Sequence, residues 1–204
     1  MPNKLDQART LLARANRIIA NEGVLDAFGH VTMRHPTEPG RYLMSRSRGP
    51  ELVQPEDIHE FTLDSQIVKP IEARLYGERV IHGEIYKARP EVNAVCHHHA
   101  PSILPFCISG AELKPVYHLG ATLGDKVPFW DSRDEFSDTS LIVAKPEEGA
   151  SLARAGLPLD RADAPTRRDR RRHDARGADV SHHLHRTQCG DADPGAYAGA
   201  CVAA

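Results

Sequence analysis

The composition of the chain changes near residue 155, and this change limits how much of the chain can fold around a core. Residues 156–204 contain eight arginines but no lysine, and seven aspartates but no glutamate. Apart from Ala and Cys, the hydrophobic residues of this stretch are Leu157, Leu159, Val180, Leu184, Tyr197 and Val202. So few scattered apolar side chains do not offset the conformational entropy that ordering costs. We therefore expect a folded domain over residues 1–155 and a largely disordered tail over residues 156–204.

The composition of the tail allows two other interpretations. Its arginines cluster between residues 167 and 172, as in a basic arm for nucleic acid, but aspartates are interspersed and no aromatic residue accompanies the cluster. The tail also has the excess of Arg, Ala, Gly, Pro and Asp that a GC-rich gene yields in a wrong reading frame. Codons compatible with the chain from Ala155 onward, shifted by one nucleotide, permit a β-rich run, ATVVGTT, and then a long helix pattern. A frameshift near residue 155 is therefore a hypothesis that gene sequencing tests.

The charge, hydropathy and cysteine content of the chain exclude several classes of protein. The formal net charge is −2, which gives no general attraction to nucleic acid or to anionic membranes. No apolar run approaches the ~18 residues needed to span a bilayer, and the charged amphipathic start is unlike a signal peptide. The four cysteines lie far apart without CxxC spacing, so neither a disulfide framework nor a zinc ribbon is indicated. We expect a soluble cytoplasmic protein that binds neither nucleic acid nor membrane.

Helix and strand patterns alternate over the first 155 residues. Apolar residues from Leu5 to Ile19 recur at three- and four-residue steps, which predicts a helix that ends near Gly23. Further helices are predicted over 72–89, 101–109 and 147–154. Strand patterns occupy 30–35, 41–47, 92–97 and 140–144, and residues 57–66 are predicted to form a hairpin. This alternation predicts an α/β layered domain.

Residues able to carry chemistry concentrate around three consecutive histidines. Side chains alternate along a strand, so His97 and His99 are expected to point to the same side while His98 faces away. Two converging imidazoles are a natural pair of ligands for a divalent metal ion. The residues also allow a second interpretation, in which the histidines form a polar strand end exposed to solvent.

A carboxylate and a fourth histidine precede this strand. Glu78 lies on the predicted second helix, one turn before His82. A carboxylate that faces two metal-binding histidines can serve as a ligand or as a general acid or base; otherwise Glu78 is a solvated helix charge. His82 is expected to orient a metal ligand rather than to be one.

The run GERVIHGEIYKARPEVNAVCHHHAPS closely resembles the class II aldolase/adducin family of metal-dependent aldolases. The resemblance covers most of residues 10–155, including the segment IIANEGVLDAFGHVT. It implies a three-layer α/β/α domain with a mixed, largely antiparallel central sheet. It also implies that His97 and His99 bind one divalent metal ion, zinc or else manganese, and that Glu78 is the catalytic carboxylate. The implied assembly is a homotetramer.

The family takes a third metal histidine from a later His-Gly motif. No His-Gly pair follows His99 in this chain. The shifted reading contains one, RQHGATVV, with the histidine codon at Thr166 and the glycine codon at Arg167. The chain as written is therefore expected to lack one of three metal ligands, which would weaken zinc binding.

The positions that bind phosphate in relatives differ here. Phosphate-using members have a glycine–asparagine turn, a threonine–glycine turn and a Ser-Ser pair before the catalytic glutamate. The corresponding positions read Gly29-His30, Ser45-Arg46-Ser47-Arg48-Gly49 and Tyr76-Gly77. Two arginines have appeared, and arginine suits planar carboxylates. Together with the segments CHHHAPSILPFCISG and HLGATLGDKVPFWDS, this resembles the branch that decarboxylates hydroxylated aromatic or pyridine dicarboxylates.

The sequence therefore predicts a metal-dependent carbon–carbon lyase that acts on a small carboxylate substrate. Arg46 or Arg48 would orient a substrate carboxylate, although a solvated strand edge explains both equally well. Glu78, or a water at the metal, would protonate the carbanion that remains when CO2 leaves.

Several further assignments and alternatives stay open. Ser45 and Gly29 are expected to contribute to substrate binding, and His30 and His118 are either pocket residues or structural hydrogen-bonding residues. The alternative functions are a sugar-phosphate aldolase or epimerase, a non-catalytic adducin-like module, and an inactive product of a damaged gene.

Overall fold

One mixed sheet organises the part of the chain that the computed structural model describes, namely residues 3–114, 116, 118 and 127–155 and the backbone of 199–203. Its strands run in the order β3-β2-β1-β4-β5. Their bounds are β1 (His30–Arg34), β2 (Arg41–Ser45), β3 (Ile58–Thr62), β4 (Ala94–His98) and β5 (Gly199–Ala203). All neighbouring strands pair antiparallel except β4 and β5, which are parallel. The predicted mixed, largely antiparallel sheet is confirmed.

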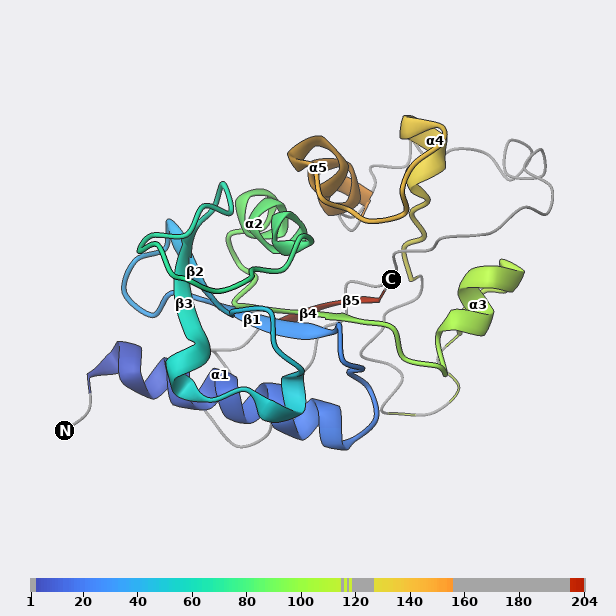
Figure 1. The fold of residues 1–204 in the computed structure, drawn as a ribbon. Helices are drawn as coiled ribbons and strands as arrows, with labels where there is room; N and C mark the ends of the chain where they lie inside the picture. The colour runs from blue at the N-terminus through green and yellow to red at the C-terminus, as the bar shows by residue number, and fades with distance from the viewer. Residues whose placement is uncertain (1–2, 115, 117, 119–126, 156–198, 204) are drawn as a thin grey trace.

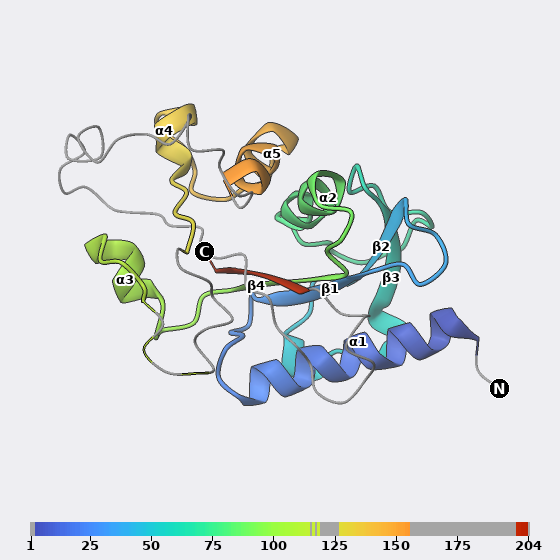
Figure 2. The ribbon, with the colours of Figure 1, turned by 180° about the vertical axis from the view of Figure 1, so that it is seen from behind.

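Helices cover both faces of the sheet (Figure 1). The long helix α1 (Lys4–Asn21) lies under one face, and α2 (Arg79–Ala88) and α5 (Pro146–Ala155) lie over the other. The view from behind shows the same three layers (Figure 2). Shorter elements complete the order: η1 (Pro50–Leu52), η2 (Pro55–Asp57), α3 (Leu104–Ser109) and α4 (Ser132–Phe136). The three-layer α/β/α architecture expected from the sequence is confirmed.

The strand pattern explains why the sheet has a core on each side. In β2, Tyr42 and Met44 are buried in the cluster that also contains residues of α2 and α5. Leu43, between them, is buried in the cluster that contains residues of α1. Because successive side chains of a strand point to opposite faces, both faces must be covered.

Helix α1 is fixed at its start and near its middle by hydrogen bonds. The Asn3 side chain accepts from the Asp6 backbone N–H at 2.8 Å and caps the helix. The buried Asn16 side chain accepts from the Val31 N–H at 3.0 Å and donates to the Leu12 carbonyl at 2.9 Å. Asn16 therefore ties α1 to β1, the strand that begins at His30.

Glycines let α2 pack closely on its neighbours. A Cβ at Gly83 would lie 2.4 Å from the Leu63 carbonyl oxygen, a distance that real Cβ atoms do not adopt. A Cβ at Gly149 in α5 would lie 3.1 Å from the Val80 carbonyl oxygen in α2. The close approach of α2 to the 63–65 turn and to α5 depends on the missing side chains.

The predicted helix over 72–89 is wrong in its first half, because α2 begins only at Arg79. The Ser47 N–H donates to the Arg74 carbonyl at 2.8 Å, and the Tyr76 hydroxyl bonds to the Arg48 backbone. The Arg74 carbonyl, which a helix would have paired within itself, instead accepts from the segment after β2, so tertiary contacts override the local preference.

Two other differences concern strands. The predicted strand over 140–144 is absent: Leu141 has a φ of 69°, which is incompatible with extended backbone. Conversely, β5 forms inside the segment expected to be disordered, and its backbone pairs with β4. The rest of the predicted tail, residues 156–198, lies outside the described residues, as does the frameshift hypothesis that concerns it.

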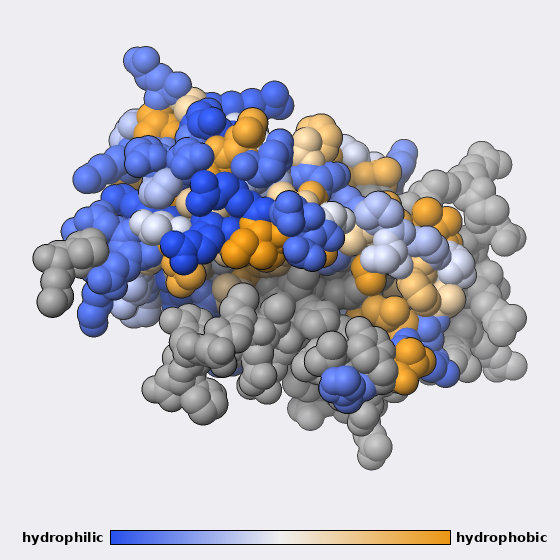
Figure 3. Space-filling view, turned by 90° about the horizontal axis from the view of Figure 1, so that it is seen from below, coloured by the Kyte–Doolittle hydropathy of each residue, from blue (hydrophilic) through white to orange (hydrophobic). Residues whose placement is uncertain are grey.

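The surface over α1 is mostly hydrophilic, with apolar side chains scattered among charged ones (Figure 3). Exposed apolar residues in α1 and η1 include Leu11, Ile18 and Leu52. Among the described residues, no helix is both long enough and apolar enough to cross a membrane.

Candidate active site

The candidate site forms where the start of β1 lies beside the end of β4. Their antiparallel register places His30 opposite His97. The two imidazole rings stack with their centroids 4.9 Å apart, and both side chains are fully buried. Backbone pairing therefore fixes the relative position of two of the predicted site histidines.

Glu78 brings a carboxylate to this pair from the beginning of α2. It is the N-cap residue rather than a residue inside the helix, which corrects the predicted location. Its Oε2 lies 3.3 Å from Nε2 of His97, and its side chain is 21% exposed. The structure therefore brings together the predicted catalytic carboxylate and one predicted metal ligand.

The surroundings of Glu78 favour its ionised form. Burial alone would raise the pKa of the Glu78 carboxyl, but His97, His99 and a hydrogen bond from the Val143 backbone together hold it below its ordinary value of 4.5. Glu78 is thus a carboxylate at neutral pH, able to hold a cation or to accept a proton.

His99 lies just after β4 and faces the same side as His97. The two ring centroids are 4.9 Å apart, with the rings nearly perpendicular. Nδ1 of His99 lies 3.0 and 3.1 Å from the carboxylate oxygens of Asp26. A carboxylate that accepts from Nδ1–H leaves Nε2 of His99 unprotonated, which is the form that binds a metal ion.

Sequence reasoning missed Asp26. Its Oδ1 also accepts from the Phe28 and Gly29 backbone N–H groups, at 2.9 and 2.8 Å, so one carboxylate holds both the turn and His99. The signal was present in the sequence, since Asp commonly accepts from the backbone two and three residues ahead in turns. What it could not show is that the turn lies against His99, 73 residues away.

Gly29 is required by a close approach rather than by an unusual backbone angle. A Cβ at this position would lie 2.8 Å from a methyl carbon of Leu25 and 3.1 Å from the His97 carbonyl oxygen. Its contacts let the turn before β1 lie against β4, whereas the expected contribution of Gly29 to substrate binding stays a prediction.

His82 contacts His30 rather than a predicted metal ligand. Its Nε2 lies 3.0 Å from Nδ1 of His30, and its Nδ1 lies 2.7 Å from the Thr32 hydroxyl. Burial, together with neighbouring histidines, lowers the pKa of both His30 and His82 well below the ordinary value of 6.5. Both rings are therefore neutral at physiological pH.

Tyr76 connects the histidines to the segment that follows β2. Its ring packs edge-on against His30 with a centroid distance of 4.3 Å. Its hydroxyl donates to the Arg48 carbonyl and accepts from the Arg48 N–H at 3.2 Å, and it also contacts the buried Ser45 side chain. Tyr76 therefore connects the predicted substrate residues Ser45 and Arg48 to the histidine cluster.

Arg46 and Arg48 share one carboxylate. Nε of Arg46 lies 2.6 Å from Asp57, and Nη1 of Arg48 lies 3.1 Å from the other oxygen of the same group. Asp57 is nearly buried, whereas about a third of each arginine side chain is exposed. Two guanidinium groups on one carboxylate leave a net positive charge and unused N–H donors near the site.

The predicted pocket residue His118 is exposed. Its expected role in the pocket stays a prediction.

The donor set of the site fits a divalent metal ion. His30, Glu78 and His97 each offer one ligand atom, and these atoms lie within 4.8 Å of one another. Among the described residues, Nδ1 of His97 and Nε2 of His30 are buried without a hydrogen-bond partner, and Nε2 of His97 faces the Glu78 carboxylate at 3.3 Å. Buried polar atoms are normally satisfied, so these atoms indicate that a ligand or metal completes the site. His99 is outside this tight group but adjacent to it.

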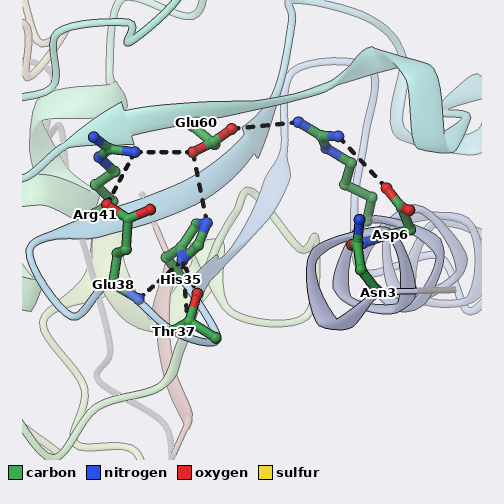
Figure 4. Close-up of polar contacts among 8 residues, drawn as sticks. Asn3, Asp6, His35, Thr37, Glu38, Arg41 and Glu60 are labelled. Atoms are coloured by element: carbon green, nitrogen blue, oxygen red, sulfur yellow. Dashed lines mark hydrogen bonds and ion pairs between the residues drawn. The ribbon is translucent and has the colours of Figure 1, made fainter.

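A second group of potential ligands, formed by His35, Glu38 and Glu60, lies at the other end of β1 (Figure 4). Nδ1 of His35 accepts from the Thr37 and Glu38 N–H groups at 3.3 and 3.0 Å. The remaining ring proton is therefore on Nε2, which faces Glu60 at 3.5 Å. Glu60 also pairs with arginines of α1 and β2, at 3.5 and 3.2 Å. A protonated Nε2 and two nearby guanidinium groups make this group an ion-pair network rather than a cation site.

The comparison with known proteins agrees with this arrangement. Residues 10–156 match the Class II Aldolase and Adducin N-terminal domain, which covers most of the chain. The chain belongs to the class II aldolase and adducin family.

Curated members of the class II aldolase and adducin family similar to this chain include decarboxylases. The chain is 37% identical to the decarboxylase tropJ of Talaromyces stipitatus over 141 residues, which are 67% of this chain and 53% of that protein. It is 30% identical to the 3,4-dihydroxyphthalate decarboxylase of Arthrobacter keyseri over 53% of this chain and 47% of that enzyme. The chain thus spans about half the length of these curated relatives.

Solved structures of the class II aldolase and adducin family share the fold. The L-fuculose 1-phosphate aldolase of Glaciozyma antarctica matches with a TM-score of 0.54 and 25% identity, over 60% of this chain and 55% of that one. The enzyme of the same name from Thermus thermophilus matches with a TM-score of 0.56 and 22% identity, over 73% of this chain and 71% of that one. Class II aldolases use a divalent metal ion, and the Glu78–His97 group is where this chain offers ligands for one.

Proposed function

We propose that this chain carries the catalytic domain of a divalent-metal-dependent carbon–carbon lyase, and that its reaction is the decarboxylation of a hydroxylated aromatic or pyridine dicarboxylate. The supporting relatives are named decarboxylases, and one of them acts on a dihydroxyphthalate by its name. The observation that carries the proposal is the contact of Glu78 with His97 beside His99, because a carboxylate in this position would be within reach of a substrate held at a metal ion.

A divalent ion, zinc or manganese, would be held by His97, by His99 and by the carboxylate of Glu78 or a substrate oxygen. Bound there, it supplies Lewis acidity that stabilises negative charge on substrate oxygens as the carbon–carbon bond breaks. The metal and its stoichiometry are measured by elemental analysis of the purified chain.

Arg46 and Arg48 are proposed to bind a substrate carboxylate. Asp57 occupies Nε of Arg46 and Nη1 of Arg48, which holds both side chains in place and leaves other N–H groups to face an anion. Through Tyr76, the Arg48 backbone is tied to the ring that packs on His30. The arginines are therefore positioned for a carboxylate that extends away from the histidines.

Glu78 is proposed to move the proton. Because its pKa lies below the ordinary value, it enters the reaction as a carboxylate and takes the proton of the substrate hydroxyl. It then delivers this proton to the ring carbon that bears the leaving carboxylate. The carbon–carbon bond breaks, its electron pair returns to the ring, and CO2 and a phenolate are the products, so protons and charge balance.

Release of CO2 from dihydroxyphthalates and pyridine dicarboxylates, measured with the zinc- or manganese-loaded chain, tests this proposal. Glu78→Gln should reduce turnover at least about 10²-fold, the usual contribution of a positioned acid–base group, when both proteins are compared at saturating metal concentration. Glu84→Gln, on the same helix, is the control and should keep full turnover. Absence of CO2 release with every member of the panel, from a chain that binds one metal ion, would contradict the decarboxylase assignment.

A sugar-phosphate aldolase is the second candidate, favoured by the match to an L-fuculose 1-phosphate aldolase at 25% identity. The same panel should therefore include ketose 1-phosphates, with aldehyde release as the readout. The two arginines beside the site favour the carboxylate substrate over the phosphate for one reason, namely that a planar guanidinium group matches a planar carboxylate.

We also infer that residues from about 155 onward are an out-of-frame product. The family match ends at residue 156, which coincides with the change in composition. The shifted reading supplies the His-Gly pair that the family uses for its third metal ligand. A gene sequence that cannot encode this pair would refute the inference.

Assembly as a homotetramer stays a prediction, which light scattering of the purified protein would test.

A further inference from the structure

A chain of buried hydrogen bonds begins at His30 and runs away from Glu78, between β1 and α2. Nδ1 of His30 lies 3.0 Å from Nε2 of His82. Nδ1 of His82 lies 2.7 Å from Oγ1 of Thr32, which lies 2.9 Å from the hydroxyl oxygen of Tyr86. These four side chains are buried, with at most 1% of each residue exposed. No solvent is available to satisfy a misplaced proton in this chain.

The protons in this series of hydrogen bonds can all point in one of two directions. In the first, Tyr86 donates to Thr32, Thr32 donates to His82, and Nε2–H of His82 donates to Nδ1 of His30. In the second, every bond is reversed, and Nδ1–H of His30 donates to His82. An imidazole that accepts at one nitrogen carries its proton on the other, so the two arrangements differ in the free nitrogen of His30.

Counting unsatisfied groups distinguishes the two arrangements. In the reversed arrangement the Tyr86 hydroxyl has no acceptor among the described residues, and the lone pair on Nε2 of His30 has no donor. In the first arrangement only the Nε2–H of His30 is unsatisfied. Each arrangement leaves one buried donor without an acceptor, but the reversed one also leaves a lone pair without a donor, so the first arrangement is preferred.

We propose that Tyr86, Thr32 and His82 fix the tautomer of His30, so that His30 presents an N–H donor at Nε2 to substrate oxygen and is not a metal ligand. The two ring nitrogens point to different sides, so Nε2 lies on the side away from His82. Within this series of hydrogen bonds, the Nε2–H of His30 is the donor left without an acceptor, and it lies at the site. An oxygen of the substrate carboxylate, or an oxygen that gains negative charge in the reaction, would accept from it. This substrate chemistry rests on the proposed function, whereas the tautomer does not.

Nitrogen-15 NMR of the full metal-free chain, labelled at histidine, tests the tautomer directly. His30 is expected to show a protonated Nε2 and an unprotonated Nδ1, and the opposite pattern would overturn the proposal. In Thr32→Val the hydroxyl that contacts His82 is removed, and both directions then leave one donor and one lone pair unpaired, so the His30 signals should move toward a mixture of tautomers. Unchanged His30 signals in this variant would show that the Thr32 hydroxyl does not set the tautomer.

Tyr42→Phe is the control for removal of a buried hydroxyl. Tyr42 is as buried as Thr32, and its hydroxyl oxygen lies 3.1 Å from both Ser65 Oγ and the Arg79 carbonyl oxygen. Loss of its hydroxyl should leave the His30 tautomer as in the unmodified chain. A change of tautomer in both variants would indicate general loosening of the core and would count against the specific chain.

Metal affinity and substrate affinity separate the two possible roles of His30. His30→Ala should bind zinc with an affinity within about threefold of the unmodified chain, whereas loss of a metal ligand or its direct support costs about 10–100-fold or more. Its KM for the carboxylate substrate should rise about tenfold, and His30→Gln, which restores an N–H donor, should recover part of this loss. A large loss of zinc affinity would overturn the proposal. If no tested substrate is turned over, the tautomer and zinc measurements still decide it.

Discussion

The carboxylate of Asp26 lies 3.0 Å from Nδ1 of His99, although the two residues belong to the turn before β1 and the segment after β4. The same carboxylate accepts from two backbone N–H groups of its own turn. A contact of this kind orients an imidazole and fixes which ring nitrogen carries the proton. The backbone of the turn holds Asp26, so the turn conformation influences how well His99 can bind a metal ion.

Replacement of Asp26 should weaken metal binding without unfolding the turn. In Asp26→Asn the side-chain oxygen can still accept from Phe28 and Gly29, but the charge beside His99 is lost. We expect zinc affinity to fall about 10–100-fold, measured by competition with a chelator. Glu22→Gln, an exposed change nearby, should leave the affinity unchanged. Equal affinities for Asp26→Asn and the unmodified chain would mean that His99 does not contribute to the metal site.

Gly83→Ala should destabilise the fold even though alanine is the better helix former. Alanine gains about 1 kcal/mol over glycine inside a helix. Here its Cβ would lie 2.4 Å from the Leu63 carbonyl oxygen, so α2 must move from the 63–65 turn. We expect a net loss of about 1–3 kcal/mol in the free energy of unfolding, the typical cost of overpacking.

Gly40→Ala is the control for that measurement, since a Cβ at Gly40 meets no atom within 4 Å. Its free energy of unfolding, measured by urea denaturation, should change by no more than about 0.5 kcal/mol. If both variants unfolded at the same urea concentration, the close packing of α2 would be refuted.

Asp57 should make stability depend on pH in the acid range. Burial raises the pKa of its carboxyl. The Gln54 N–H and the guanidinium groups of Arg46 and Arg48 lower this pKa by more than burial raises it, so the pKa lies below the ordinary value of 3.8. A lowered pKa in the folded chain contributes stability above the unfolded value. That contribution is lost as the pH falls from 3.8 through the folded pKa.

Asp57→Asn should therefore be less stable by about 1–3 kcal/mol at neutral pH, because the arginines lose their shared charge. Its stability should also fall less steeply than that of the unmodified chain below about pH 4. The measurement is urea denaturation at a series of pH values. Asp138→Asn, an exposed change, should reproduce the steep dependence; a steep dependence in Asp57→Asn as well would assign the acid sensitivity to other groups.

Restoring the shifted reading frame from residue 155 should raise the metal content of the chain. The family-type third histidine would then be encoded, and three ligands hold zinc more tightly than two. We expect close to one zinc per chain after dialysis, by elemental analysis, and a larger soluble fraction. Identical metal content in the restored and unrestored chains would argue that the present sequence already has its full ligand set.

Much of the fold could be predicted because its patterns are local. The helical spacing from Leu5 to Ile19 and the alternation of Tyr42, Leu43 and Met44 reflect burial on one helix face or two sheet faces. Residues 72–78 could not be read in this way. Their hydrogen bonds go to the end of β2, so tertiary contacts decide a conformation that local preference would have made helical.

The site was predictable where chemistry follows spacing, and not where it follows register. The interval between His97 and His99 predicts two imidazoles on one side, as observed. That His30 lies opposite His97 depends on strand pairing, and that Asp26 reaches His99 depends on a turn far away in sequence. The direction of the hydrogen bonds from Tyr86 to His30 depends on the burial of all four side chains in the series, which a short sequence motif does not indicate.

The pairing of His30 with His97 has a consequence for how the chain folds. If β1 shifted by one residue along β4, each of its side chains would move to the opposite face of the sheet, and His30 would leave the site. A metal ion or substrate that binds only the correct pairing would then add its binding free energy to that pairing alone. The ligand would therefore raise the population of the correct register relative to every slipped form of the sheet that it cannot bind.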